Sequence, residues 1–333
     1  MKTNVLAVDV GYGNTKFAYR AADGTVATGM FPSLAQYAPA RSISGGNGTG
    51  FRTRDVTQVT INGTPYEVGP GVSMTAAYGN TGRVLVDDYV LSNNYAALLA
   101  GAIYRSGHTR IARLVLGLPV HTLAKFSRDL VERFVGDHDF GQGVITIEKV
   151  NVIAQPLGTL TYATTLRADK SGASQQHLVV DVGYYTTDWV YVSDFQIDDR
   201  RSGGRPGGMS QILQRIAEDI GKDQGEPVYD IERIDVCLRE GRPFHFYNQE
   251  IDIQSYLTDA QQVINDVMVD VKNRVGPVEG IRSIILSGGG ADLYGPIIRQ
   301  TFPRTFIDKL ENPCFANASG FLIVGESASR TVH

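Results

Sequence analysis

Cysteine is scarce in this chain of 333 residues, which contains only Cys237 and Cys314. The two lie far apart and match none of the spacings with which cysteines bind metals. We therefore expect buried structural thiols in a reducing compartment rather than a metal site.

Charge of one sign and long apolar runs are lacking as well. Lys and Arg number 31 against 35 for Asp and Glu, a net charge of −4, which gives neither a polybasic surface nor an acidic tail. No stretch approaches the roughly 18 apolar residues that cross a bilayer. The opening MKTNVLAVDVGYGNTK is a short apolar run broken by Asp9, which predicts a strand rather than a signal peptide. We expect a soluble, cytoplasmic protein that binds neither membranes nor nucleic acid directly.

An internal repeat is the most informative feature that the sequence does have. Leu6–Tyr12 reads LAVDVGY and Leu178–Tyr184 reads LVVDVGY. Each copy is a continuous apolar strand, a polar turn and a second apolar strand, and such runs are typical of strands covered on both faces. The spacing is too long for a solenoid, and the length of the chain suits two domains. We predict a duplicated domain with one hairpin in each half.

A mixed pattern of strands and helices surrounds the two hairpins. The expected strands are residues 56–61, 66–68, 114–120, 150–154 and 283–286. The expected helices are residues 89–105, 126–134, 209–220 and 254–275, one after 290 and a last one after 316. The Gly-rich segment GGNGTG (45–50) lacks the following lysine of a P-loop. We expect a loop suited to a contact between molecules, with a merely disordered loop as the alternative.

The first turn, DVGYGNTK (9–16), has the chemistry of an anion site. Asp9 stands at the end of a strand, and Gly11 and Gly13 let backbone N–H groups approach an anion closely. Three donors to phosphate oxygens follow: Asn14, Thr15 and Lys16. A plain β-hairpin is the alternative, since Gly-Asn is also ordinary turn chemistry.

The second turn, DVGYYTTD (181–188), strengthens the interpretation as an anion site. It repeats the carboxylate as Asp181 and offers further groups for phosphate: Gly183, Thr186 and Thr187. Carboxylates at equivalent positions of duplicated halves can face each other across a cleft and hold a hydrated Mg²⁺ that bridges phosphates. Two turns can also clamp a phosphate chain from both sides, and such positioning drives phosphoryl transfer.

Two further glycine segments suit a flat ligand. A strand that ends at Leu286 runs into Ser287 and then Gly288, Gly289 and Gly290, and glycine lets a base or ribose lie on the backbone. Gly208, at the start of the helix that begins with Met209, could line the other side of the base. The alternatives are a crowded strand-to-helix turn and a flexible lead-in.

Together these motifs resemble the actin-like ATPases, in particular the plasmid-partitioning ParM/StbA branch. Five segments stand in the order of that family across nearly the whole chain. They are phosphate-1 (5–16), the first connecting segment (150–160), phosphate-2 (178–190), the adenosine motif (284–296) and the second connecting segment (316–325). Within the branch, the chain is similar to protein D of the PRTRC cassettes, a plasmid-borne subtype found with ParB-related and ThiF-related proteins.

The resemblance implies a fold and a cofactor set. The fold is an α/β, actin-like (ribonuclease H-like), duplicated two-domain ATPase fold with the nucleotide in an interdomain cleft. Domain I would be residues 1–160 plus 316–333, and domain II residues 161–315. The ligands would be ATP and Mg²⁺, with ATP against GTP left open.

The resemblance also implies roles for individual residues. Asp9 and Asp181 would organise Mg²⁺ and its waters, and Lys16 would contact the β- or γ-phosphate. The remaining contacts would go to phosphates (Gly183, Thr186, Thr187) and to adenosine (Gly288, Gly289, Gly290). Gln155 would position the attacking water; because a neutral amide is no strong base, hydrolysis should be slow. A turn residue before Pro156 is the alternative for Gln155.

Three functions remain open at this point. The first is a filament-forming ATPase that segregates plasmids, with the chain itself and a DNA-binding adaptor as partners. The second is an actin-fold small-molecule kinase, although no clear substrate-base carboxylate stands out. The third is a non-polymerising nucleotide-dependent regulator, without the long C-terminal peptide-binding domain of heat-shock chaperones.

Overall fold

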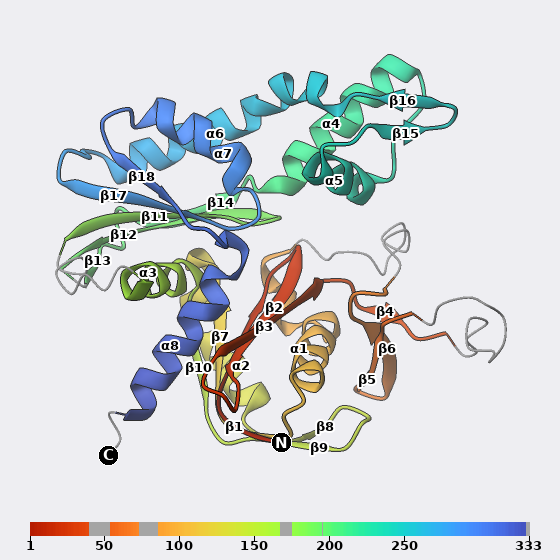
Figure 1. The fold of residues 1–333 in the computed structure, drawn as a ribbon, viewed down its shortest axis with the longest axis vertical. Helices are drawn as coiled ribbons and strands as arrows, with labels where there is room; N and C mark the ends of the chain where they lie inside the picture. The colour runs from red at the N-terminus through yellow and green to blue at the C-terminus, as the bar shows by residue number, and fades with distance from the viewer. Residues whose placement is uncertain (40–53, 73–85, 167–174, 195, 331–333) are drawn as a thin grey trace. The chain divides into compact units, whose positions relative to one another are not determined.

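The computed structural model describes residues 1–39, 54–72, 86–166, 175–194 and 196–330 (Figure 1). The segment GGNGTG (45–50) lies outside the described residues. The chain forms two compact units: unit 1 is Met1–Leu118, Thr122–Gly158 and Asn317–His333, and unit 2 is Pro119–His121 and Thr159–Ala316. As functional domains, residues 1–160 plus 316–333 and residues 161–315 stay a prediction.

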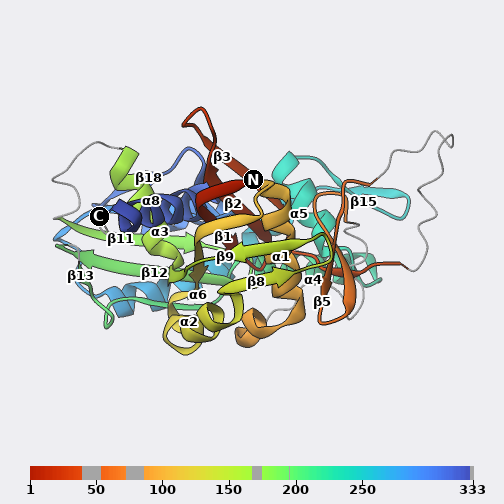
Figure 2. The same ribbon diagram turned by 90° about the horizontal axis from the view of Figure 1, so that it is seen from below.

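Unit 1 is built on a mixed seven-stranded sheet of order β3-β2-β1-β7-β9-β8, in which β10 also pairs with β7. The strands are β1 (Lys2–Val10), β2 (Asn14–Arg20), β3 (Val26–Pro32), β7 (Arg110–Leu118), β8 (Gly136–Asp139), β9 (Val144–Ile147) and β10 (Val150–Ala154). Strands β8 and β9 run side by side at one edge (Figure 2). A small sheet of β4 (Gln36–Tyr37), β6 (Thr64–Val68) and β5 (Thr57–Ile61) confirms the expected strand pair.

Helices stand between and after the strands of unit 1 along the chain. They are η3 (Asp87–Leu91), α1 (Asn93–Ser106), α2 (Val120–Phe134), the start of α3 (Gln155–Leu166) and most of α8 (Ala316–Arg330). The expected single helix 89–105 is wrong at its start, because the Ser92 side chain accepts the Tyr95 N–H and begins α1 there. The expected strand 114–120 ends earlier, since Val120 opens α2.

Unit 2 repeats the plan with a six-stranded sheet of order β13-β12-β11-β17-β18, in which β14 also pairs with β12. The strands are β11 (Gln176–Val182), β12 (Thr186–Ser193), β13 (Gln196–Ile197), β14 (Gly203–Pro206), β17 (Ile281–Ser287) and β18 (Phe306–Lys309). Its helices are α4 (Met209–Gln224), α5 (Ile231–Glu240), η5 (Ile253–Tyr256), α6 (Leu257–Val275), α7 (Ala291–Thr301) and η6 (Pro313–Phe315). A hairpin of β15 (Phe244–Phe246) and β16 (Gln249–Ile251) completes it.

Both faces of the unit 2 sheet are covered, as the continuous apolar strands predict. Val180 of β11 packs with residues of α4, α6 and α7, which lie along one face (Figure 1). Val179, which points the other way, packs against Ala163 of α3. Among the described residues, no helix has the length and apolar content that crossing a membrane requires. Cys237 is buried as expected, whereas Cys314 is half-buried.

The sequence repeat is a structural repeat with the same strand register. In unit 1, Asp9 pairs with Lys16 across antiparallel strands β1 and β2. In unit 2, Asp181 pairs with Asp188 across β11 and β12. Each first strand also has a parallel neighbour on its other side, β7 in unit 1 and β17 in unit 2. The two hairpins predicted from the sequence are therefore confirmed.

Helices α3 and α8 contact each other through two glycines. A Cβ on Gly158 would lie 2.5 Å from the Phe321 ring and 2.8 Å from the Asn317 carbonyl oxygen. A Cβ on Gly320 would overlap the backbone of Gly158 itself. Only glycine allows this approach, so the crossing fixes where α3 begins beside α8.

We predict that Gly320→Ala destabilises the protein by about 1–3 kcal/mol, although alanine is the better helix former, because the added methyl group meets backbone that cannot move aside. The measurement is the free energy of unfolding in denaturant. Glu326→Ala on the same helix is the control and removes only a partly exposed ion pair with Arg20, which should cost about 1 kcal/mol or less. If both substitutions lowered the free energy of unfolding equally, the close contact of α3 and α8 at Gly320 would be contradicted.

Candidate functional site

The carboxylate of Asp9 is the centre of the unit 1 turn. Asp9 is the second-last residue of β1 and is 1% exposed. Its Oδ2 lies 3.2 Å from Lys16 Nζ, and its Oδ1 accepts a hydrogen bond of 2.7 Å from Gln155 Nε2. A buried carboxylate is costly unless donors compensate it. The fold thus brings together three predicted site residues, although Gln155 is far from the other two in sequence.

Ser33, which the sequence analysis did not select as a site residue, stabilises the backbone of this turn with two hydrogen bonds. Ser33 Oγ donates to the Gly11 carbonyl at 2.5 Å, and its N–H donates to the Gly13 carbonyl at 3.0 Å. Thr15, which is fully buried, has its hydroxyl 2.9 Å from Ser33 Oγ. Because the Ser33 proton goes to Gly11, Thr15 is the donor in that pair. Asn14 is half-buried at the start of β2.

The carboxylate of Asp181 is the matching group of unit 2. It is 7% exposed at the second-last position of β11. Ser287 Oγ, at the end of β17, donates to Asp181 Oδ1 at 3.0 Å. Thr159 of α3 in turn donates to Ser287 Oγ at 3.0 Å. Two hydroxyl groups that the sequence did not identify therefore position this carboxylate.

The unit 2 turn differs from the unit 1 turn at one position. Asp188 occupies the place of Lys16 in the register and is 2% exposed. Its Oδ1 accepts the Val120 N–H at 3.0 Å, at the start of α2, and lies 3.6 Å from His121 Nδ1. A helix N-terminus stabilises an anion. A Cβ on Gly204 would overlap the Asp188 carboxylate, so glycine there leaves room for it.

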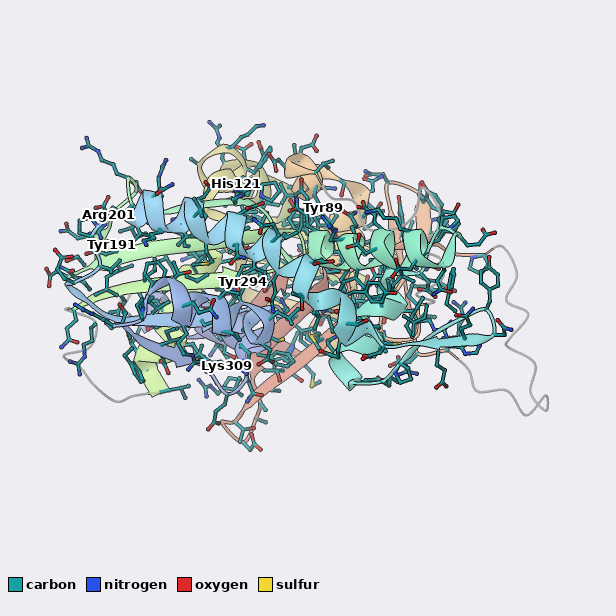
Figure 3. The ribbon with its side chains drawn as sticks, turned by 90° about the horizontal axis from the view of Figure 1, so that it is seen from above. Tyr89, His121, Tyr191, Arg201, Tyr294 and Lys309 are labelled. Atoms are coloured by element: carbon teal, nitrogen blue, oxygen red, sulfur yellow. The ribbon has the colours of Figure 1, made fainter. Side chains whose placement is uncertain are left out.

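Thr187 belongs to a buried hydroxyl network. Its Oγ1 lies 3.1 Å from the Gly207 carbonyl and 3.3 Å from the Tyr294 hydroxyl, which donates to the same carbonyl. Burial raises the pKa of Tyr294, labelled in Figure 3, to about 12, so its hydroxyl remains a donor at neutral pH. Thr187 is fully buried, and Thr186 is 5% exposed with its carbonyl accepting the Gly183 N–H.

Four glycines of unit 2 meet around the end of β11. A Cβ on Gly208 would lie 2.6 Å from the Gly183 carbonyl oxygen, so the start of α4 packs closely against the β11–β12 turn. Gly288 has a φ of +86°, and its Cβ would lie 2.7 Å from Asp181 Oδ1. A Cβ on Gly290 would come within 3.0 Å of the Met209 sulfur, whereas Gly289 has open space around it. The turn of three glycines after β17 is therefore crowded at Gly288 and Gly290 and open at Gly289.

The structure thus places the predicted site residues in two clusters, one in each unit. No group of three or more His, Cys, Asp or Glu side chains that could hold a metal ion occurs in the described part of the chain. Each turn has a buried carboxylate near the end of its first strand, and carboxylates of this kind suit a hydrated Mg²⁺, which keeps several of its waters.

Comparison with known proteins identifies the family. Residues 7–158 match the N-terminal domain of actin-like proteins, and residues 179–300 match the C-terminal domain of the archaeal, MreB-like actin homologue. The chain belongs to the actin-like proteins. A search of curated proteins finds no match to the chain.

Solved structures of actin-like proteins share the fold. A ParM from Clostridium botulinum, in a 15-stranded filament, has a TM-score of 0.77 and 21% identity over 98% of this chain and 100% of that chain. An archaeal actin homologue in complex with ADP has a TM-score of 0.71 and 22% identity over 98% and 99%. The Alp12 filament structure has a TM-score of 0.66 and 13% identity over 98% and 99%. The expected actin-like, two-domain α/β fold is confirmed.

We predict that Gln155→Glu makes stability fall as pH rises. The introduced carboxylate would lie against buried Asp9, and two such groups cannot both ionise, so the folded state would hold a proton that the unfolded state loses. Since the folded state then binds more protons, stability is lost with rising pH. Relative to Gln155→Ala, we expect a deficit of roughly 2 kcal/mol at pH 8 that shrinks toward pH 5. Thermal unfolding across this range tests it, and parallel curves for the two variants would contradict the Asp9–Gln155 contact.

Proposed function

We propose that this actin-like protein is an ATPase that binds ATP with Mg²⁺ through the β1–β2 and β11–β12 turns and polymerises into filaments. The observation that carries the proposal is the pair of buried carboxylates, Asp9 and Asp181, at equivalent positions of two duplicated hairpins. An archaeal actin homologue of the same fold holds ADP. Asp9 and Asp181 would hold Mg²⁺ through its waters, and the ion would offset the charge of the phosphates.

The turns would hold the phosphates chiefly with backbone groups. Gly11, Gly13 and Gly183 carry no side chain that would keep an anion away from the backbone of the turns, and Lys16, which is paired with Asp9 at 3.2 Å, would also contact a phosphate. Thr15 and Thr187 are buried in hydrogen bonds to Ser33 and to the Gly207 carbonyl. We assign these two threonines to the shape of the turns. Gly288, Gly289 and Gly290 would carry the adenosine, with Gly208 at the start of α4.

Gln155 would orient the attacking water. Its Nε2 donates to Asp9, which leaves the amide oxygen as an acceptor for a proton of water. The Asp9 contact fixes which end of the amide is presented, and this supports the proposed role. An amide cannot take up the proton as a strong base does, and hydrolysis should therefore be slow.

Polymerisation is proposed from the family. The ParM from Clostridium botulinum and Alp12 form filaments, and nucleotide state would set filament stability in this chain. Segregation of a plasmid through a DNA-binding adaptor is the cellular role that we propose. The net charge of −4 gives the chain no electrostatic footprint for DNA of its own.

We predict that Asp9→Asn and Asp181→Asn each lower Mg²⁺-dependent ATP hydrolysis at least about a hundredfold, because each removes a charge that would organise the metal waters. The asparagine keeps the size of the side chain but replaces one acceptor oxygen with a donor, so we also expect a lower melting temperature, and turnover is measured well below it. Phosphate release is the measurement, with Asp137→Asn, an exposed residue bonded to Thr146, as the control. Undiminished turnover in either variant would remove that residue from the metal site.

We further predict that the protein sediments as a polymer with ATP or a non-hydrolysable analogue, and that the critical concentration rises with ADP. The physical reason is that a head-to-tail contact that does not close into a ring grows without limit. Pelleting and electron microscopy at several protein concentrations are the measurements. A monomer in all three nucleotides, with phosphate transferred to added sugars, would instead support a small-molecule kinase.

A further inference from the structure

The two turns share a residue that phosphate binding does not require. In both copies a tyrosine directly follows the turn glycine, Tyr12 after Gly11 and Tyr184 after Gly183. The backbone amides of such a turn serve an anion equally well with a small side chain. Both tyrosine hydroxyls are hydrogen-bond donors over 2.9 Å, and in each unit the acceptor belongs to an element outside the central sheet.

In unit 2, the tyrosine reaches helix α5. The Tyr184 hydroxyl donates to Glu232 Oε1, and Glu232 is 5% exposed in the first turn of α5. The backbone of the same tyrosine is fixed elsewhere, since its carbonyl accepts the Ser210 N–H at 2.7 Å, in the first turn of α4. Figure 1 shows α5 beside α4 within this unit. One residue of the turn therefore connects two helices.

In unit 1, the tyrosine reaches η3 and, through it, α1. The Tyr12 hydroxyl donates to the carbonyl of Val86, the residue that precedes η3. The Tyr12 ring stacks on Tyr89 of η3, with centroids 5.2 Å apart, and Tyr89 meets Tyr95 of α1 edge-on at 5.7 Å. Aromatic contacts of this kind add to the stability that burial provides. The turn is thus linked to the elements that cover one face of the unit 1 sheet.

We infer that Tyr12 and Tyr184 are positioning residues that couple the occupancy of each turn to a peripheral element of the same unit, η3 in unit 1 and α5 in unit 2. The inference rests on the proposed nucleotide binding. A ligand shifts an equilibrium only through a difference in affinity between two states. Here the state with the hydroxyl bond holds the tyrosine, and with it the turn backbone, in one conformation. An anion that binds this conformation stabilises the bond, and the bond strengthens anion binding by the same factor.

The test in unit 2 is Tyr184→Phe, which removes only the hydroxyl. In the wild-type chain, ATP should slow hydrogen exchange of the α5 amides; in the variant this effect should disappear. Binding of a fluorescent ATP analogue should weaken about five- to tenfold, which corresponds to the net contribution of a typical intramolecular hydrogen bond. Tyr256→Phe is the matched control, because that hydroxyl donates to Asp223 Oδ2 over the same 2.9 Å. It should leave both measurements unchanged.

Variants of the acceptor separate coupling from loss of structure. Glu232→Gln keeps an oxygen that can accept from Tyr184, so the effect of ATP on α5 should persist. Glu232→Ala removes the acceptor and should behave as Tyr184→Phe does. In unit 1, Tyr12→Phe should abolish the effect of ATP on exchange in residues 87–106, with Tyr104→Phe, whose hydroxyl donates to the Gly143 carbonyl, as the control.

The outcomes distinguish this inference from the function on which it rests. If the wild-type chain binds and hydrolyses ATP, but ATP protects α5 equally in wild type and Tyr184→Phe, the coupling is overturned and the ATPase stands. If Tyr256→Phe weakens the response as much as Tyr184→Phe, the coupling is also overturned. A wild-type chain that binds no nucleotide overturns the proposed function and the coupling with it.

Discussion

A buried carboxylate at the end of a central strand needs hydrogen-bond donors, and both units are organised around that requirement. Asp9 receives them from Lys16 on the neighbouring strand and from Gln155 at the start of α3. Asp181 receives one from Ser287, which is itself held by Thr159 of α3. Without these partners the charged groups would be expensive to bury. Strand β2, the start of α3 and the end of β17 therefore each supply a partner to one of the two aspartates.

The fold was largely predictable because its signals are local. LAVDVGY and LVVDVGY each carry a run of apolar residues and a turn within a few positions, and the structure confirms both hairpins and the parallel strands beside them. The sequence did not predict strands that lack such a run. Strand β14 consists of Gly203–Pro206 and pairs with β12 because its glycines leave room for Trp189 and Asp188. The residues that explain why β14 forms a strand therefore lie in β12 and not in β14 itself.

Residue type and spacing predicted the part of the site that lies within the sequence motifs. The motifs identified Asp9, Lys16 and Gln155, whose contacts the structure shows. They did not reveal Ser33 or Thr159, because a hydroxyl that bonds to a distant segment leaves no local pattern. Thr15 was expected to face phosphate, yet its hydroxyl bonds to Ser33. Strand alternation explains this, since Thr15 lies on the opposite face of β2 from Lys16.

The difference between the two hairpins follows from the same register that makes them alike. Lys16 and Asp188 occupy equivalent positions, so the first turn pairs a carboxylate with an ammonium group, while the second carries two buried carboxylates. The partners of Asp188 are a backbone N–H and a histidine, so the unit 2 turn keeps more negative charge than the unit 1 turn. In an ATPase, a phosphate chain would therefore be better accommodated at the first turn than at the second. In the proposed ATPase, duplication would supply two similar frames, each with a carboxylate for Mg²⁺, and one exchanged side chain would add the phosphate-binding ammonium group of Lys16 to the first frame.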